Sequence, residues 1–161
     1  MLEQNSFFHV GIVVRDFDAT VERLTRQRGL TWSPVVHVEL SVWTRDWGVR
    51  TIMPRAAYST VEPCIEVIQE IPNTPMVSLP GHPLHHLGYW TNDLERESRR
   101  LEDAGCPKVM CPIHDGKMFG VAYHEAADGL LIELVDRSSF SDWPAFLAGR
   151  MQHRVILPEA R

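Results

Sequence analysis

The sequence has few cysteines, no long hydrophobic run and no excess of basic residues. Its three cysteines, Cys64, Cys106 and Cys111, form no Cys-x-x-Cys pair, and their odd number indicates reduced thiols rather than a disulfide framework. None of the apolar runs is long enough to cross a bilayer, and the opening "MLEQNS" does not resemble a secretory signal. We therefore expect a cytoplasmic protein with no membrane partner.

The charge balance argues against a nucleic-acid partner. The 161 residues include 16 Lys and Arg against 21 Asp and Glu, which gives a formal net charge of −5. Basic residues are scattered along the chain, whereas binding to a phosphate backbone requires a basic surface. With 44% hydrophobic residues, the chain has enough apolar surface for one core, and we expect a single domain over 1–161.

An internal repeat organises the chain. The segment "FHVGIVVRDFDATVERL" (8–24) aligns with "HHLGYWTNDLERESRRL" (85–101) without a gap. Each copy reads as a short apolar strand, an Asp suited to capping a helix, and a helix-length stretch. The alignment pairs His9 with His86, Gly11 with Gly88, and Asp16 with Asp93.

A second pair of segments completes each copy of the repeat. "PCIEVIQ" (63–69) matches "LLIELVD" (130–136), which pairs Glu66 with Glu133. Alternating stretches between these anchors, such as "VVHVELSVW", predict strands, so each half reads as β-α-β-β-β. We expect the first module at about 7–70, a proline-rich linker at about 71–83, the second module at about 84–136 and a tail at 137–161. A short helix is predicted in the tail from the apolar residues Trp143, Phe146, Leu147 and Met151.

Strand geometry places the paired polar residues on one face of the sheet. Residues i and i+2 share a face, so His9 lies with Gly11, and His86 lies with Gly88. The aliphatic neighbours of Glu66 and Glu133 are expected to face the helices, which turns both carboxylates the other way. Burying a carboxylate is costly unless it is paired, hydrated or bound to a cation. Taken singly, each residue is more often structural; together, two imidazoles and two carboxylates predict a site for a divalent ion such as Zn, Ni, Co, Mn or Fe.

These motifs resemble the vicinal oxygen chelate superfamily, which includes glyoxalase I, methylmalonyl-CoA epimerase, extradiol dioxygenases and proteins of fosfomycin and bleomycin resistance. The resemblance covers 7–136 and is strongest with the epimerase-like branch, through "HHLGYWTNDLE" and through "HDGK" followed by "AYHEAADGLLIEL". It implies an α+β fold in which two tandem β-α-β-β-β modules form a U-shaped mixed sheet around a metal-centred cavity. It also implies one divalent ion per site, held by His9, Glu66, His86 and Glu133, and a homodimer.

The sequence also departs from two members of the superfamily. Arg45, Asp46 and Trp47 stand where the epimerases carry an acidic residue and a Gln before Gly-Val, which argues against a CoA thioester substrate. The Phe-Tyr-x-x-x-Leu-Gly signature of glyoxalase I is missing from "DATVERLTRQRGL", which argues against glutathione.

The resemblance implies an isomerase, epimerase or lyase. A metal acting as a Lewis acid would chelate two vicinal oxygens of a small substrate and stabilise an enediolate formed by proton removal. Glu133 is our first choice as the base and Glu66 our second. Two alternatives remain: an extradiol-type dioxygenase, which normally presents two His and one Glu to iron, and a non-enzymatic drug-binding or ligand-binding protein, which commonly lacks the ligands.

The sequence offers weaker indications about the substrate. Trp90 is expected to share the face of His86, and His37 and Trp43 the corresponding face of the first module. These positions predict aromatic walls and a substrate with an apolar or ring-containing body. Histidines expected near the rim of the cavity, His37, His85, His114 and His124, are further candidates for the base, and His114 and His124 are also candidates for substrate binding.

Overall fold

The computed structural model describes residues 6–78, 81–140 and 142–150. The elements of the first module are β1 (Phe7–Val14), α1 (Phe17–Arg28), β2 (Val36–His37), β3 (Leu40–Thr44), β4 (Gly48–Ile52), β5 (Arg55–Tyr58) and β6 (Cys64–Gln69). Those of the second are β7 (His86–Thr91), α2 (Leu94–Asp103), β8 (Lys108–His114), β9 (Lys117–Met118), β10 (Val121–Glu125) and β11 (Leu131–Asp136). A 3₁₀ turn (Arg137–Ser139) and α3 (Trp143–Leu147) follow, while Met151 lies outside the described residues.

The two long helices begin at the paired aspartates of the repeat. The Asp16 carboxylate accepts a hydrogen bond from the Ala19 amide at 2.9 Å, and the Asp93 carboxylate accepts one from the Arg96 amide at 3.0 Å. Each aspartate thereby satisfies an amide that the first helical turn leaves unpaired. Both helix starts are placed as the sequence predicts.

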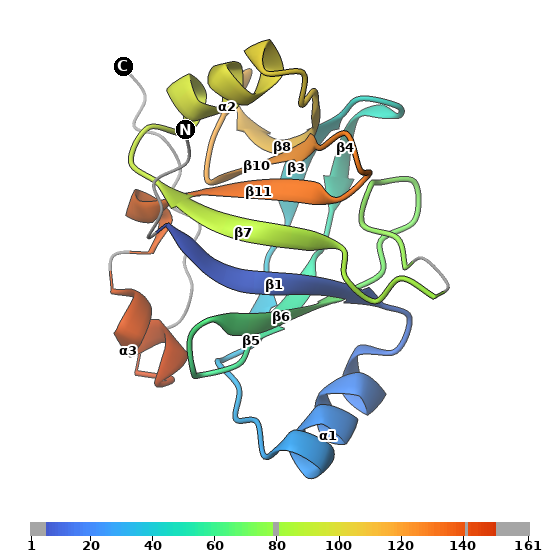
Figure 1. Cartoon of the computed structure of the whole chain (residues 1–161), viewed down its shortest axis with the longest axis vertical. Helices are drawn as coiled ribbons and strands as arrows, with labels where there is room; N and C mark the ends of the chain where they lie inside the picture. Colours follow the sequence, from blue (N-terminus) through green and yellow to red (C-terminus); the bar gives the residue numbers. More distant parts are fainter. Residues whose placement is uncertain (1–5, 79–80, 141, 151–161) are drawn as a thin grey trace.

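The strands form one mixed sheet in which the two modules meet at β1 and β7. These strands are antiparallel neighbours, and each runs parallel to the last strand of its own module, β6 or β11. The full order is β2-β5-β6-β1-β7-β11-β10-β8-β3-β4, with β9 attached to β8. Figure 1 shows the four central strands β6, β1, β7 and β11 side by side. The expected α+β fold is confirmed.

A long hairpin of the first module (36–58) joins the two edges of this sheet. Its β5 pairs with β6 of the same module, but its β3 pairs with β8 of the second, where Val42 lies opposite Pro112. The strands at the two ends of this order, β2 and β4, therefore belong to the same hairpin. One arm of the hairpin consists of β2 followed by β3, and the other of β4 followed by β5. The hairpin curls the U-shaped sheet back on itself, and the strands enclose an interior.

Helices α1 and α2 cover the outer face of this curled sheet. The interior is therefore lined by side chains of the inner face. Val67, next to Glu66, packs with Phe17 of α1, and Leu134, next to Glu133, packs with Leu94 of α2. The aliphatic neighbours of both glutamates therefore face the helices, as predicted. The short α3 packs through its aromatic residues at one end of the sheet (Figure 1). In the described part of the chain, none of the helices has the length and apolar character needed to span a membrane.

Candidate metal centre

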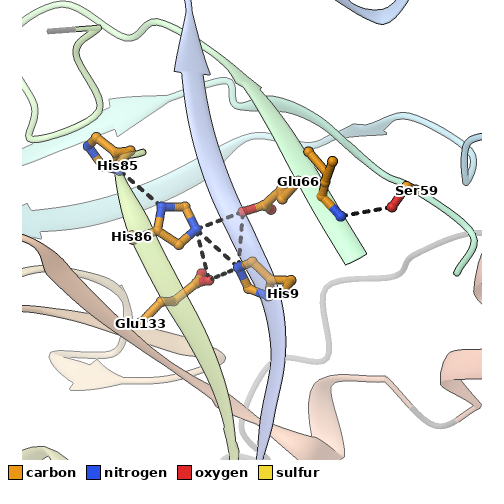
Figure 2. A network of polar contacts seen from close by, with 7 residues as sticks. His9, Ser59, Glu66, His85, His86 and Glu133 are labelled. Atoms are coloured by element: carbon orange, nitrogen blue, oxygen red, sulfur yellow. Dashed lines mark hydrogen bonds and ion pairs between the residues drawn. The ribbon is translucent and has the colours of Figure 1, made fainter. Parts of the chain in front are cut away.

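Four neighbouring strands each contribute one polar side chain to a buried cluster. His9 on β1 and His86 on β7 lie in the middle, and Glu66 on β6 and Glu133 on β11 flank them. Figure 2 shows the four side chains converging from their strands. All four are buried, with exposures of 0–3%. A single chain supplies the whole cluster.

The donor atoms of the cluster are spaced like ligands around one ion. The two imidazole Nε2 atoms are 3.0 Å apart; His9 Nε2 lies 2.8 Å from Glu133 Oε2, and His86 Nε2 lies 2.9 Å from Glu66 Oε2. The two remaining distances from imidazole to carboxylate are both 3.4 Å. Ligands at right angles around a metal with bonds of about 2.1 Å lie about 3.0 Å apart. The cluster therefore has the size of a mononuclear metal site.

Two glycines make room for the imidazole rings. The register of β1 and β7 places His9 opposite Gly88, and Gly11 opposite His86. A Cβ on Gly88 would lie 1.9 Å from His9 Cε1, and a Cβ on Gly11 would lie 1.9 Å from His86 Cε1. Each ring lies across the glycine of the other strand, which explains why the repeat carries a His-x-Gly pattern in both copies.

The cluster is electrostatically coupled. Burial lowers the pKa of His9, but the carboxylates of Glu133 and Glu66 outweigh it and raise that pKa to about 9. Burial raises the pKa of both glutamates, but the neighbouring imidazoles outweigh it and hold the glutamate pKa values below the usual range. With neutral imidazoles, the cluster would carry two buried negative charges, which a divalent cation would compensate. The donor set therefore fits such an ion in charge as well as in size.

Two tyrosines that the sequence analysis did not identify lie beside the glutamates. Tyr58 on β5 is the cross-strand partner of Glu66, and Tyr123 on β10 is the partner of Glu133. Burial, together with the two carboxylates, raises the pKa of both phenols well above its usual value. The tyrosines therefore stay protonated, as neutral hydroxyl groups. Each tyrosine lies on the strand before a glutamate strand, so hairpin pairing is the signal that points to them.

A cavity of about 140 Å³ lies against the two glutamates and the two tyrosines. The rest of its wall is mostly apolar and comes largely from the 36–58 hairpin and from β8 and β10. The hairpin contributes Val36, Val38, Leu40, Val42, Ile52, Pro54 and Ala56. Among the described residues that line the cavity, none is Lys or Arg. Within the described lining, the formal charges are those of Glu66 and Glu133.

The structure does not place His37 and Trp43 in this wall. Their strand segment alternates as predicted, but its apolar face, with Val36 and Val42, is the face that lines the cavity. His37 is exposed, and Trp43 packs on the outside with the cluster beneath α2. The expected placement of His37 and Trp43 in the wall is wrong, because the sequence analysis assigned the apolar face of this strand to a core, whereas that face lines an apolar cavity.

The other predicted substrate residues also lie away from the cavity. Trp90 stacks on Phe8, with ring centroids 3.8 Å apart, and packs under α3. His124 points outward, with its ring nitrogens 3.0 Å from Ser98 Oγ of α2 and 2.9 Å from the Cys106 carbonyl oxygen. Its burial lowers the pKa of the imidazole. These environments give Trp90 and His124 packing roles.

The remaining two histidines lie outside the cavity wall as well. His114, at the end of β8, is partly exposed and lies 3.7 Å from the carboxylate of Asp115. His85 is mostly enclosed behind His86 and contacts the His86 ring. Burial, followed by the neighbouring His86, lowers the pKa of His85 to about 4, so this ring is neutral.

Comparison with known proteins agrees with the fold and identifies the family. Similar solved structures include methylmalonyl-CoA epimerase from Mycobacterium tuberculosis, with 24% identity, a TM-score of 0.50 and coverage of 84% of this chain and 92% of that one. A variant of the Streptomyces coelicolor epimerase in complex with 2-nitronate-propionyl-CoA has 21% identity and a TM-score of 0.54, over 81% and 96% of the two chains. A hypothetical protein from Bacillus halodurans has 16% identity and a TM-score of 0.58, over 87% and 99%.

No curated protein sequence matches the chain. The family model described as the glyoxalase/bleomycin resistance protein/dioxygenase superfamily matches residues 8–123. The match extends from the first strand of the repeat to β10 of the second module. The chain therefore belongs to the glyoxalase/bleomycin resistance protein/dioxygenase superfamily, as its resemblance to vicinal oxygen chelate proteins implied.

Proposed function

We propose that the protein is a divalent-metal-dependent isomerase, epimerase or lyase. In this proposal it removes a proton from a carbon next to two vicinal oxygens of a small substrate with an apolar body. The observation that carries the proposal is a cluster of four buried donor groups, two of which, Glu66 and Glu133, line an apolar cavity. Burying two carboxylates in such a wall is costly unless they are paired or bind a cation, which supports a metal at this place.

His9, Glu66, His86 and Glu133 would hold the ion. A set of two imidazoles and two carboxylates without a thiolate suits Zn, Ni, Co, Mn or Fe. The bound ion would supply Lewis-acid polarisation of two neighbouring substrate oxygens, which acidifies the adjacent C–H bond.

The glutamates are the groups placed to move the proton. Both line the cavity, and they lie on opposite sides of the histidine pair, on β6 and β11. Glu133 accepts the proton in this proposal, and the protonated hydroxyl of Tyr123 beside it orients the carboxylate. Return of this proton from Glu133 to the same carbon would retain its configuration, and return to the neighbouring carbon would isomerise the substrate. Inversion would require a proton taken up from water to be delivered from the Glu66 side, while Glu133 releases the proton it accepted to solvent.

The cavity wall favours a substrate with a hydrocarbon body. One similar structure contains a CoA ester, 2-nitronate-propionyl-CoA. A CoA ester carries several phosphate charges, but the described lining residues of this cavity include no Lys or Arg. Aliphatic side chains such as Val42 and Ile68 would instead bury an apolar group, at a gain of about 25 cal/mol per Å².

The test is proton exchange by the metal-loaded protein. Metal content is measured by elemental analysis, and 2-oxo and 2-hydroxy acids with alkyl or aryl bodies are then incubated in D₂O alongside an acyl-CoA. We expect the C–H signal in ¹H NMR to disappear for the apolar acids and to persist for the acyl-CoA. At saturating metal, Glu133→Gln should abolish exchange, whereas His114→Gln, outside the cavity, should leave it unchanged.

Three results would overturn the proposal. The first is an absence of bound metal after titration with each of the five ions. The second is tight binding of the apolar acids without exchange or turnover, which would identify a ligand-binding protein. The third is consumption of O₂ with ring opening of a catechol, which would identify a dioxygenase.

A further inference from the structure

His85 contacts the side of His86 that faces away from the donor cluster. His85 Nδ1 lies 3.0 Å from His86 Nδ1, and His85 Nε2 lies 2.9 Å from the carbonyl oxygen of Pro75. Figure 2 shows His85 beyond the His86 ring, on the side opposite Glu66 and His9. The Pro75 carbonyl, the two rings and the donor cluster thus form one continuous chain of contacts.

The donors and acceptors along this chain of contacts match one arrangement of the protons. A carbonyl oxygen only accepts, so His85 Nε2 must donate its hydrogen to Pro75. An imidazole that donates from Nε2 can accept at Nδ1, so the contact of 3.0 Å between the two Nδ1 atoms is satisfied when His86 Nδ1–H donates to His85 Nδ1. With a metal bound, the lone pair of His86 Nε2 would then be directed at the ion; in the metal-free protein this nitrogen lies 2.9 Å from Glu66 Oε2. His85, which does not reach the cavity, thus supplies the partner for the other nitrogen of the His86 ring.

We infer that His85 is a positioning residue that holds His86 in its metal-binding tautomer and ring orientation. The inference rests on the proposed function, because it takes His86 as a metal ligand. Partners of this kind commonly change metal affinity by 10-fold to 100-fold when they are removed.

The linker between the modules anchors this chain of contacts. The Ile71 amide donates to the Met76 carbonyl at 2.8 Å, and Thr74 Oγ1 donates to the Ile71 carbonyl at 2.8 Å. Met76 is 2% exposed, so this turn is tied into the interior. The Pro75 carbonyl is thus presented to His85 by a hydrogen-bonded turn, which gives the linker a part in the site.

The first module has no equivalent of this arrangement. In the repeat, Phe8 occupies the position of His85, and its ring stacks on Trp90. His9 Nδ1 is buried without a hydrogen-bond partner among the described residues. The two histidines of the cluster are therefore unequal: His86 Nδ1 has a partner in His85, and His9 Nδ1 has none among the described residues.

Two variants separate this role from simple packing. In His85→Asn, the side-chain oxygen can take the place of Nδ1 as the acceptor for His86. In His85→Phe, the ring volume is kept, as at Phe8, but the acceptor is lost. Zn²⁺ affinity is measured on the metal-free variants by competition with a chromophoric chelator. We expect roughly 10-fold to 100-fold weaker binding for His85→Phe and a smaller loss for His85→Asn.

Zinc binding by His85→Phe as tight as by the wild type, or tighter than by His85→Asn, would overturn the inference. A second readout does not depend on any variant: ¹⁵N NMR of histidine-labelled wild-type protein should show an unprotonated Nδ1 on His85 and a protonated Nδ1 on His86. The opposite pattern would also overturn it.

A parallel His86→Ala variant separates this inference from the proposed function. If His86→Ala binds Zn²⁺ as the wild type does, His86 is not a ligand and the proposed function fails with the inference. If His86→Ala loses the metal while His85→Phe retains wild-type affinity, the inference about His85 fails alone.

Discussion

Replacing Gly88 with alanine should disable the proposed metal centre although none of the donor residues is replaced. The added Cβ would lie 1.9 Å from His9 Cε1, whereas ordinary contact begins at 3.4 Å, so the ring must move by 3.4 − 1.9 = 1.5 Å or the strands must separate. The His9 ring is fully buried, in edge contact with Phe8 and Tyr58 at centroid distances of 4.4 and 5.5 Å. It has little free space into which to move.

The expected magnitudes follow from this overlap. Metal–ligand distances in proteins hold to within about 0.2 Å, so a ring displaced by more than an ångström no longer binds the ion. We expect Gly88→Ala to weaken Zn²⁺ binding by at least about 100-fold, as loss of a ligand would. Overpacking of this kind also costs about 1–3 kcal/mol in the free energy of unfolding of the metal-free protein.

The assay is a double-mutant cycle. The free energy of unfolding is measured by urea denaturation of metal-free wild type, Gly88→Ala, His9→Ala and the double variant, and Zn²⁺ affinity is measured for each. Without the imidazole, the methyl group has room, so Gly88→Ala should cost almost nothing in the His9→Ala background. Equal costs in both backgrounds, or wild-type zinc affinity in Gly88→Ala, would refute the reasoning.

Three further predictions concern the titration of the cluster and the outer face of the sheet. Zinc affinity should rise about tenfold or more per pH unit from pH 7 to 9. The reason is that the metal must displace the proton on His9, whose pKa the carboxylates of Glu133 and Glu66 raise to about 9. A zinc affinity that stayed constant in competition titrations over this range would contradict the prediction. The contribution of His9 to the free energy of unfolding of the metal-free protein should be fully present below pH 6.5, the pKa of an unfolded histidine. It should be lost as pH rises from there to about 9, the raised pKa in the folded protein, and urea denaturation should show a smaller decline in a Glu133→Gln variant. His124→Leu should cost about 1–3 kcal/mol of stability by leaving Ser98 Oγ and the Cys106 carbonyl without their partner, and a zinc affinity that also fell would show that His124 is part of the site.

The residues of the donor cluster were predictable because they combine two local signals. The repeat pairs His9 with His86 and Glu66 with Glu133, and strand alternation orients each one. When the two modules pack side by side, symmetry alone brings four such residues together. Their convergence in the structure follows that expectation, and their binding of a metal stays a prediction.

The cavity wall was not predictable in the same way. The alternation of apolar and polar residues separates the two faces of a strand, but it does not tell which face lines the cavity. The residues that line an apolar cavity have the same sequence pattern as residues of a buried core. Tyr123 and His124 illustrate this: they are adjacent on β10, and it is the tyrosine that faces the cavity while the histidine faces α2. The pairing of β3 with β8 was also out of reach, because it joins strands from different copies of the repeat.

The hairpin (36–58) and the four donor residues belong to separate segments of the chain. It supplies much of the cavity wall, yet all four donor residues come from strands outside it. Substitutions within the hairpin can therefore alter which substrate body is accepted while the ion-binding residues stay intact. This contiguous segment is suited to diversification and to exchange between homologues, and a library confined to it would vary selectivity against a constant reactive centre.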